Sequence, residues 1–489
     1  MKHFCMPVLI ALPVLAGIVL AAARMRRRTC KLWLMTAVFA VEAAGVVWLA
    51  LNGADDVTLF RLTDTLVISL SLDRLGKLFA LVFSFAWMLV GIFSFRYMTH
   101  EKREDLFFSF FLICEGMLLG ACFAANLISL YLFYEMVSLL SMPLVLHSLT
   151  REAVAAALKY LFYSVGGAFL ALFGLFVLSR YCTTLTFTPG GTLDLAALPG
   201  KENLVRAAAF CSILGFGVKA GLFPLHAWLP TAHPVAPAPA SAVLSGIITK
   251  IGVIASIRMI YCITGTQLLA GSWVQQTLLV LSLISVFMGS MMALRETVFK
   301  KRLAYSTVSQ VSYVLTGVFL MNEQALTGGL LHVVFHASIK VCLFLTAGSI
   351  IYHTGKTNVT DYRGLGKQMP LTLWCFTFAS LALVGIPPFS GFVSKWYLAA
   401  GALGSGLGAF TWVIPAVLLI SALLTAGYLI TITAIGFFPG KDFVVRGKRC
   451  DGSVLMWGPI AALALFCLLA GVFSGVLVDL ARSVAQSLM

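Results

Sequence analysis

Ionisable side chains lie inside stretches of this sequence that are otherwise apolar over roughly twenty residues, the length of a membrane span. We call seven of them the ionisable series: Glu135, Lys219, Lys250, His332, His336, Lys340 and Lys395. Each ionised group held near the centre of a bilayer costs on the order of 3 kcal/mol on insertion scales. So many such groups in one chain indicate a path for protons or ions.

Three members of the series share one face of a predicted helix. His332, His336 and Lys340 recur at i, i+4 and i+8, which covers about 12 Å at a rise of about 1.5 Å per residue. Histidine titrates near neutral pH and removal of a lysine from water favours its neutral form, so both can pass protons through bridging water. The alternatives are hydrogen-bonded packing histidines, or a metal site that lacks a carboxylate third ligand on this helix. Glu135 is the natural counter-charge, because an uncompensated carboxylate there would protonate.

Two lysines lie beside helix-breaking residues. The segment GFGVKAGLFPLHAWLP carries Lys219 shortly before Pro224, and VGIPPFSGFVSKW carries Lys395 shortly after Pro388. Proline removes a helix hydrogen bond, and backbone freed at membrane depth is tolerated only where protein or a water-filled cavity satisfies it. Paired interrupted helices are typical of a transport site between inverted repeats. The alternative is two kinked helices that serve only packing.

The composition requires a membrane protein of all-α class. Of 489 residues, 60% are hydrophobic and 11% are charged, which excludes a water-soluble globular domain. We expect one membrane domain over 1–489, with inverted repeats of five helices each at 106–261 and 273–437, and broken helices seven and twelve. About fourteen spans are predicted, at 4–23, 32–51, 75–95, 106–125, 127–147, 156–179, 205–225, 238–261, 273–294, 303–320, 326–352, 371–399, 411–437 and 457–480.

The net charge of +15 reflects membrane topology and not nucleic-acid binding. With the amino terminus outside, the inner loops carry twenty lysines and arginines and the outer loops about six, as the positive-inside rule demands. Both termini are then extracytoplasmic. The inner set comprises Arg24, Arg26, Arg27, Arg28, Lys31, Arg96, Lys102, Arg103, Arg151, Arg295, Lys300, Lys301, Arg302, Lys356, Arg363, Lys367, Lys441, Arg446, Lys448 and Arg449, and the outer side has an acidic loop with Asp55, Asp56, Asp64 and Asp73.

Neither a cofactor nor a metal is expected in this chain. The eleven cysteines form no C-x-x-C pair, there is no phosphate-binding loop, and no glycine-rich dinucleotide motif follows a strand. Outside the series, we expect Glu42 to be a packing or pairing residue, and for Glu115 a functional role and structural pairing are equally expected. We expect Lys159 to extend its ammonium group to the membrane interface.

Six segments resemble one family: LYLFYEMVSLLSMPLVL, ALKYLFYSVGGA, GFGVKAGLFPLHAWLPTAHPVAPAPASAVLSGIITKIGV, KKRLAYSTVSQVSYVLTG, HASIKVCLFLTAGSI and GIPPFSGFVSKW. They are similar to the proton-translocating antiporter-like subunits of respiratory complex I, Mrp-type sodium/proton antiporters and membrane-bound hydrogenases. The resemblance covers about 105–400. It implies an ion pair between Glu135 and Lys219 in the first half of the path, with Lys250 as the connecting residue. It also implies a middle relay of His332, His336 and Lys340, and Lys395 as the terminal group.

The resemblance also implies a context for this chain. We expect a multi-pass subunit of a prokaryotic inner membrane, with other membrane subunits as partners, that moves protons, with Na+ crossing through the assembled complex. Ser245 stands where many complex I relatives have histidine, no amphipathic lateral helix follows the last span, and Lys395 replaces a glutamate. These departures favour the D-type component of an Mrp antiporter.

The alternatives are a hydrogenase, formate hydrogenlyase or complex I-like NADH:quinone oxidoreductase subunit, a non-pumping structural subunit, and an organic solute carrier. No covalent chemistry is expected in the chain, so an oxidoreductase label would describe the complex.

Overall fold

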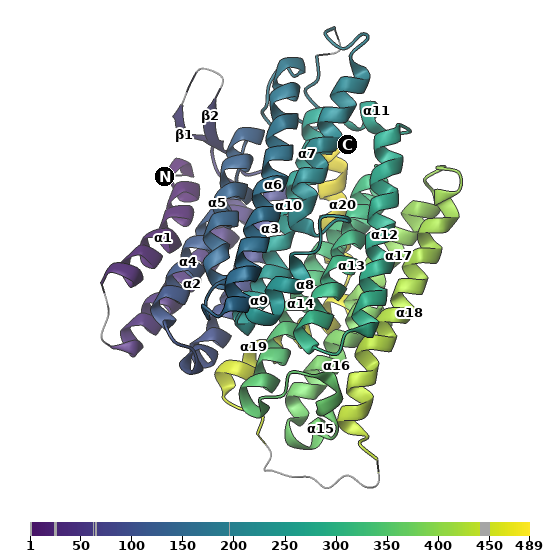
Figure 1. The fold of residues 1–489 in the computed structure, drawn as a ribbon. Helices are drawn as coiled ribbons and strands as arrows, with labels where there is room; N and C mark the ends of the chain where they lie inside the picture. Colours follow the sequence, from purple (N-terminus) through teal and green to yellow (C-terminus); the bar gives the residue numbers. More distant parts are fainter. Residues whose placement is uncertain (1, 24–26, 62, 64–65, 195, 441–449) are drawn as a thin grey trace.

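The computed structural model describes residues 2–23, 27–61, 63, 66–194, 196–440 and 450–489. The chain is a bundle of long helices that run roughly along one direction (Figure 1). Several charged residues used in the topology argument lie outside the described residues: Arg24, Arg26, Asp64, Lys441, Arg446, Lys448 and Arg449.

The first part of the chain contains six long helices and a small hairpin. The helices are α1 (Lys2–Ala22), α2 (Arg28–Asn52), α3 (Arg74–Tyr97), α4 (Glu104–Cys122), α5 (Leu127–Val145) and α6 (Arg151–Tyr181), with the short η1 (Met98–His100) after α3. Strands β1 (Val57–Arg61) and β2 (Val67–Leu70) pair antiparallel, with Val57 opposite Leu70. This hairpin is a small addition to the predicted all-α class.

The central part begins with an interrupted helix. It comprises α7 (Glu202–Ala220), α8 (Leu229–Val235), α9 (Ala238–Val243), the π-helical η2 (Leu244–Ile248), α10 (Thr249–Ile257), the π-helical η3 (Arg258–Thr264), α11 (Thr266–Leu269), α12 (Trp273–Arg295), α13 (Phe299–Phe319) and α14 (Glu323–Thr354). The remainder comprises η4 (Val359–Tyr362), α15 (Leu365–Gln368), α16 (Pro370–Val384), α17 (Ser390–Leu403), α18 (Phe410–Phe437), α19 (Val454–Val472) and α20 (Gly475–Leu488).

Polar side chains begin several of the helices. Asn126, Thr150 and Asn322 each accept a hydrogen bond from the backbone N–H three residues later, at 2.7, 3.2 and 2.8 Å. Such caps satisfy amide groups that have no partner within the helix. The starts of α5, α6 and α14 are therefore fixed locally by the sequence.

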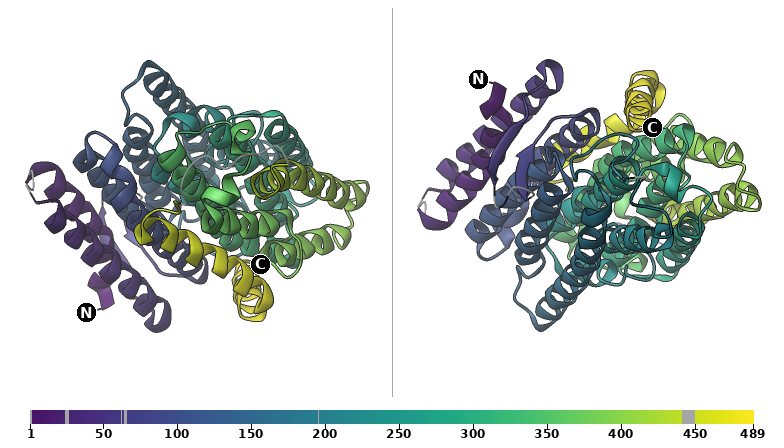
Figure 2. Two further views of the ribbon diagram at one scale, coloured as in Figure 1. Left: turned by 90° about the horizontal axis from the view of Figure 1, so that it is seen from below. Right: turned by 90° about the horizontal axis from the view of Figure 1, so that it is seen from above.

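Helix α14 forms the centre of the bundle. It packs against α13, α16, α17, α19 and α20 and also touches α3 and α9, and residues from 325 to 350 are almost all buried. Figure 2 shows α1 and α2 at one end of an elongated bundle and α18 at the other. A helix buried on all of its faces lies in the core of a bundle, so the polar stripe of α14 lies at the centre of the molecule.

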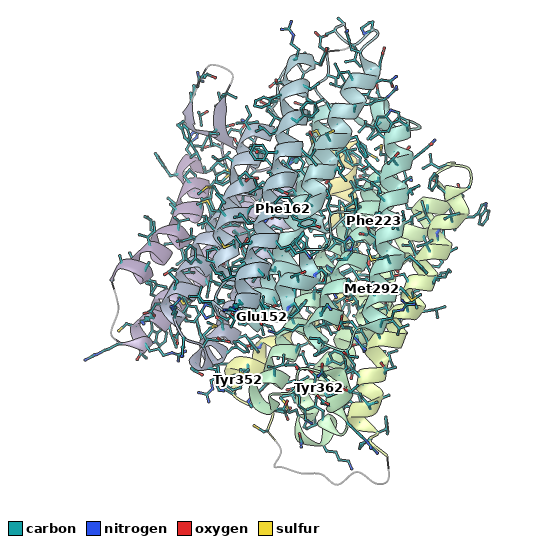
Figure 3. All side chains as sticks on the ribbon, viewed as in Figure 1. Glu152, Phe162, Phe223, Met292, Tyr352 and Tyr362 are labelled. Carbon is teal, nitrogen blue, oxygen red and sulfur yellow. The ribbon has the colours of Figure 1, made fainter. Side chains whose placement is uncertain are left out.

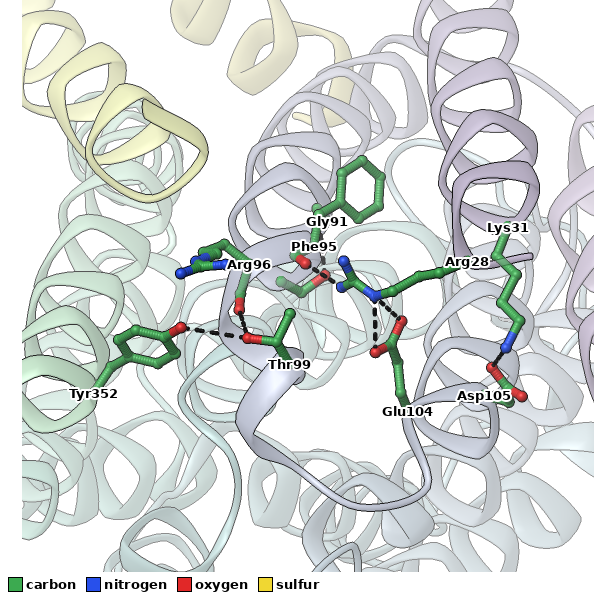
Figure 4. Close-up of polar contacts among 10 residues, drawn as sticks. Arg28, Lys31, Gly91, Phe95, Arg96, Thr99, Glu104, Asp105 and Tyr352 are labelled. Carbon is green, nitrogen blue, oxygen red and sulfur yellow. Dashed lines mark hydrogen bonds and ion pairs between the residues drawn. The ribbon is translucent and has the colours of Figure 1, made fainter. Parts of the chain in front are cut away.

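Ion pairs fasten α2 to α4 at the end where both helices begin (Figure 4). Arg28 Nε lies 2.9 Å from Glu104 Oε1, and Lys31 pairs with Asp105. The Arg28 guanidinium also donates to the carbonyl of Phe95, in the last turn of α3. These contacts join three helices of the N-terminal part at one level.

The two predicted helix breaks are confirmed. Helix α7 ends at Ala220 and α8 begins at Leu229, while α16 ends at Val384 and α17 begins at Ser390. In each of the ranges 106–261 and 273–437 the broken helix is the fourth long element. The inverted relation between the two ranges stays a prediction.

The end of the chain differs from expectation. The predicted span at 457–480 is divided, because α19 ends at Val472 and the separate α20 packs on α14. Among the described residues, twelve helices are long and apolar enough to cross a membrane. Helix α13 and the α16 and α17 pair fall outside that set, so the count of fourteen stays a prediction. Both termini lie in the same half of the bundle (Figure 1).

Candidate functional site

Lys219 lies in the last turn of α7, where the helix stops inside the bundle. Gly221 follows with φ of 76°, a conformation that glycine adopts without strain. Trp228 Nε1 donates to the Val218 carbonyl at 2.8 Å, and Phe223 N–H donates to Ser285 Oγ at 2.8 Å. Protein groups therefore satisfy the backbone that the break sets free. Figure 3 labels Phe223 in this break, near the mid-height of the bundle.

The ammonium group of Lys219 contacts a tyrosine and not a carboxylate. It hydrogen-bonds to the hydroxyl of Tyr160 and lies 4.4 Å from the centre of that ring, and Lys219 is fully buried. The Tyr160 hydroxyl in turn lies 2.6 Å from Ser141 Oγ. Ring and hydroxyl together stabilise a cation, so Tyr160 is a site residue that charge patterning did not reveal.

Glu135 and Lys219 are neighbours without forming a contact ion pair. Each carries a charge that acts on the other, but their pair is absent from the ion pairs formed by the described residues. Glu135 Oε1 is buried without a hydrogen-bond partner. The expected ion pair is thus open in this structure, and the ammonium group of Lys219 donates to Tyr160 instead.

Lys250 lies on α10, directly after the π-helical turn η2. Its Nζ donates to the Ser245 carbonyl at 2.6 Å, and the Ser245 hydroxyl lies 2.6 Å from Thr307 Oγ1 of α13. Gly252, on the same helix, lets α10 approach α7: a Cβ there would lie 3.1 Å from the Cβ of Lys219. Lys219 and Lys250 thus lie on two helices in direct contact.

The predicted stripe of α14 lies on one buried face. The rings of His332 and His336 are stacked with centroids 5.8 Å apart, and both residues and Lys340 are fully buried. His332 contacts Ser394 Oγ at 2.9 Å and Gln310 Oε1 at 3.1 Å. Neither ring nitrogen of His336 has a partner, so His336 is the member of the stripe that is free to bind water or a proton.

Helix α13 lines the series along most of its length. Its contacts come from one face: the Leu303 carbonyl accepts from Lys340 at 3.1 Å, Ser306 also binds Lys340, Thr307 binds Ser245, Gln310 binds His332, and the ring of Tyr313 lies 5.1 Å from Lys395 Nζ. These positions follow the helical spacing of three and four residues. The serine and threonine content of KKRLAYSTVSQVSYVLTG was the sequence signal for this lining.

Lys395 binds the end of the second broken helix. Its Nζ donates to the carbonyls of Leu383 at 2.7 Å and Val384 at 2.9 Å, which have no partner inside α16 because the helix stops there. The carbonyl end of a helix carries partial negative charge and favours a cation. Lys395 is only partly buried, whereas the other three lysines of the series are inaccessible.

The series is suited to proton transfer. Lys250, Lys340 and His336 lie within electrostatic range of one another. Hydroxyl, amide and phenol groups of α13 lie beside members of the series, and such groups are donors and acceptors for bridging water. Within the described ranges, no three histidine, cysteine or carboxylate side chains are grouped as metal ligands would be.

The residues outside the series are also placed. Lys159 Nζ donates to Thr231 Oγ1 at 3.0 Å. Glu42 and Glu115 are buried at 1% and 3% exposure, and both lie among the N-terminal helices.

A buried file of ionisable groups, crossing a helical bundle with two broken helices, defines a membrane protein that moves protons or ions. The chain belongs to the family described as NADH:quinone oxidoreductase/Mrp antiporter, TM, whose model matches residues 124–438. It is 35% identical to the N component of the NADH-quinone oxidoreductase of Desulforudis audaxviator, over 76% of this chain and 73% of that protein. It is 28% identical to the D component of the Na(+)/H(+) antiporter of Bacillus subtilis, over 83% and 80%.

Solved structures share the fold over the whole chain. A chain of respiratory complex I from Thermus thermophilus is 25% identical, with a TM-score of 0.81 and full coverage of both chains. A chain of the Mrp complex from Dietzia sp. has a TM-score of 0.85 at 23% identity, over 100% of this chain and 97% of that one. Both are multisubunit membrane complexes, and this chain is a multi-pass membrane protein.

Proposed function

We propose that this chain is the proton-translocating membrane subunit of a multisubunit cation/proton antiporter or ion-pumping redox complex. The observation that carries the proposal is the burial of Lys219 at a helix break, where its close polar partners among the described residues are a tyrosine hydroxyl and ring. A structural counter-ion would be expected against a carboxylate. A lysine held by neutral groups can give up its proton without leaving a bare charge behind.

The proposed path starts at Glu135 and Lys219 on the cytoplasmic side and runs across the bundle through Lys250 and the stripe of α14. It ends beside Lys395. When Glu135 closes onto Lys219 it favours the ammonium form, and when the pair opens that support is lost and the proton moves on. The open pair described above corresponds to the second of these states.

The proposed setting is a prokaryotic inner membrane with both termini extracytoplasmic, and the proposed partners are further membrane subunits. Relatives named for quinone oxidoreduction and for sodium/proton antiport both support the class. No cofactor is assigned to this chain. A structural subunit that has lost pumping should lack at least one member of the series, and here all seven are present.

The test is substitution of the first two members. Lys219→Ala and Glu135→Ala should each abolish proton-coupled transport while the complex still assembles, because each removes a titrating group from a single series path. Proton release or uptake is followed with a pH-sensitive dye in vesicles. Transport at the wild-type rate in either variant, with assembly verified, would exclude the proposed path.

A further inference from the structure

Two buried glutamates lie outside the proposed path, between α2, α3 and α4. Glu42 of α2 is 1% exposed and Glu115 of α4 is 3% exposed. Both side chains line one cavity and lie close enough to interact electrostatically. Neither glutamate takes part in any of the ion pairs that the described residues form. Across the described part of the chain, the pair therefore has no cation within ion-pair distance.

The helices hold these two glutamates at nearly the same depth in the membrane. Helices α2 and α4 begin at the same end and are joined there by Arg28 and Glu104. At a rise of about 1.5 Å per residue, Glu42 lies about 21 Å along α2 from Arg28, and Glu115 about 16 Å along α4 from Glu104. Both positions fall inside a hydrocarbon core about 30 Å thick. Water at the surface cannot solvate them.

Polar side chains line the cavity beside the pair. Glu42 and Glu115 line one small cavity together with Ser84 and Trp87. Ser84 Oγ donates to Glu42 Oε1 at 3.4 Å, and the fully buried indole N–H of Trp87 has no acceptor. One oxygen of each carboxyl group also lacks a partner. The residues that carry an unused donor and unused acceptors thus line one small cavity.

These groups select a proton as the ligand. Two ionised carboxylates in contact repel strongly where the dielectric is low, and an uncompensated buried charge is expensive. One shared proton leaves a single negative charge, which the Ser84 O–H donor stabilises. A hard cation requires several oxygen ligands, and the Trp87 N–H would oppose it. The cavity also leaves no room for a water molecule.

We propose that Glu42 and Glu115 form a second proton-binding site, a carboxyl and carboxylate pair that takes up and releases one proton. Helix α4 separates this site from the series: the thiol of Cys114 lies within electrostatic range of Lys219, and the next residue along the helix is Glu115, turned by about 100°. No bond other than that to the proton is made or broken.

Infrared difference spectroscopy of the full chain in lipid, between acidic and alkaline pH, tests the site. A protonated carboxyl group has a C=O stretching band that an ionised one lacks. Glu42→Gln and Glu115→Gln should each remove the same band, because the proton belongs to the pair. Glu135→Gln and the exposed Glu152→Gln, labelled in Figure 3, should both leave that band in place.

Two further measurements keep the proposal open to refutation. Trp87→Phe should shift the band without removing it, since only a polar group that lines the cavity is lost, and size-exclusion chromatography verifies that each variant is folded. The proposal is overturned if the Glu135→Gln chain shows no titrating carboxyl band, or if Glu42 and Glu115 give two bands that titrate independently. Loss of the band on adding sodium at constant pH would also overturn it, in favour of a cation site.

Discussion

Neutral groups, and not a carboxylate, hold Lys219 at the start of the proposed path. The Tyr160 hydroxyl bonds to the ammonium and is itself joined to Ser141 at 2.6 Å. A buried ammonium that loses a hydrogen-bond partner loses on the order of 1 to 3 kcal/mol. In the proposed path, Lys219 therefore exchanges between two partners, Tyr160 and Glu135, and the partner sets how strongly its charged form is favoured.

Lys219→Arg separates charge from proton transfer. Guanidinium keeps the positive charge but does not release a proton in proteins. If Lys219 hands protons onward, the arginine variant should lose transport nearly as completely as Lys219→Ala, with both assayed in the assembled complex by vesicle pH measurements. Rescue by arginine would instead assign Lys219 the role of a fixed counter-charge to Glu135.

At the scale of helices, a break supplies the partner of the last lysine. The carbonyls of Leu383 and Val384 are free to accept from Lys395 only because α16 stops at Val384. Gly385 makes the stop, with φ of 89°, and a Cβ on it would lie 3.0 Å from Cδ of Lys395. The break and the lysine are thus one structural unit.

Gly385→Ala should lower proton transport severalfold. The left-handed backbone costs a residue with a Cβ roughly 1 to 2 kcal/mol, and the new methyl group pushes against Lys395. Gly355→Ala is the matched control: its φ is 68°, it ends α14, and no atom lies within 4 Å of its added Cβ. Equal transport rates for the two variants, compared at equal amounts of assembled complex, would show that Lys395 tolerates displacement.

A second contact between elements depends on pH. Asp73 caps α3 through Gly76 N–H at 2.9 Å and binds the guanidinium of Arg258, in η3, at 2.5 and 2.7 Å. Burial acts to raise the pKa of Asp73, but the charge and hydrogen bonds of Arg258 outweigh it and hold that pKa below its ordinary value. The folded state thus binds this proton less tightly than the unfolded state.

Asp73→Asn should therefore destabilise the chain at neutral pH, because Arg258 is left without a counter-charge while the asparagine still caps α3. A carboxyl group whose pKa is lowered in the folded state stabilises that state at pH above its unfolded pKa. This stabilisation is lost as the pH falls through the folded pKa. The unfolding temperatures of wild type and variant in detergent should converge only in strongly acidic buffer. A constant difference at every pH would contradict the electrostatic explanation.

At the scale of the whole molecule, the carboxylates inside the described membrane-spanning helices are too few to surround a sodium ion. Glu135 does not line the cavity that Glu42 and Glu115 share, and Glu42 accepts a hydrogen bond there from Ser84. Sodium requires several oxygen ligands around one point. Exchange of a second cation is therefore expected to require a partner subunit.

The purified chain alone should not exchange sodium for protons. Liposomes containing only this chain are given a sodium gradient while internal pH is followed, and the expected internal pH change does not exceed that of empty liposomes. Robust sodium-dependent proton flux that disappears in the Glu135→Gln variant would show that one chain houses both pathways.

Much of this arrangement could be predicted from the sequence because it is local. The spacing of His332, His336 and Lys340 sets one helix face, and glycine and proline mark both breaks at the right places. The length of apolar runs gave most of the helices, although the division between α19 and α20 was missed because Val472 to Gly475 interrupts an apolar run without any proline.

The contacts across the bundle were decided only by the tertiary structure. Lys219 meets Tyr160, 59 positions away, in place of the expected Glu135, and Glu42 meets Glu115 although their helices are separated by α3 in the sequence. In a membrane chain, faces that touch lipid and faces that touch other helices are both apolar, so periodicity does not identify neighbours. Close packing of the helices selects the partners, and the partner determines what a buried polar group can do chemically.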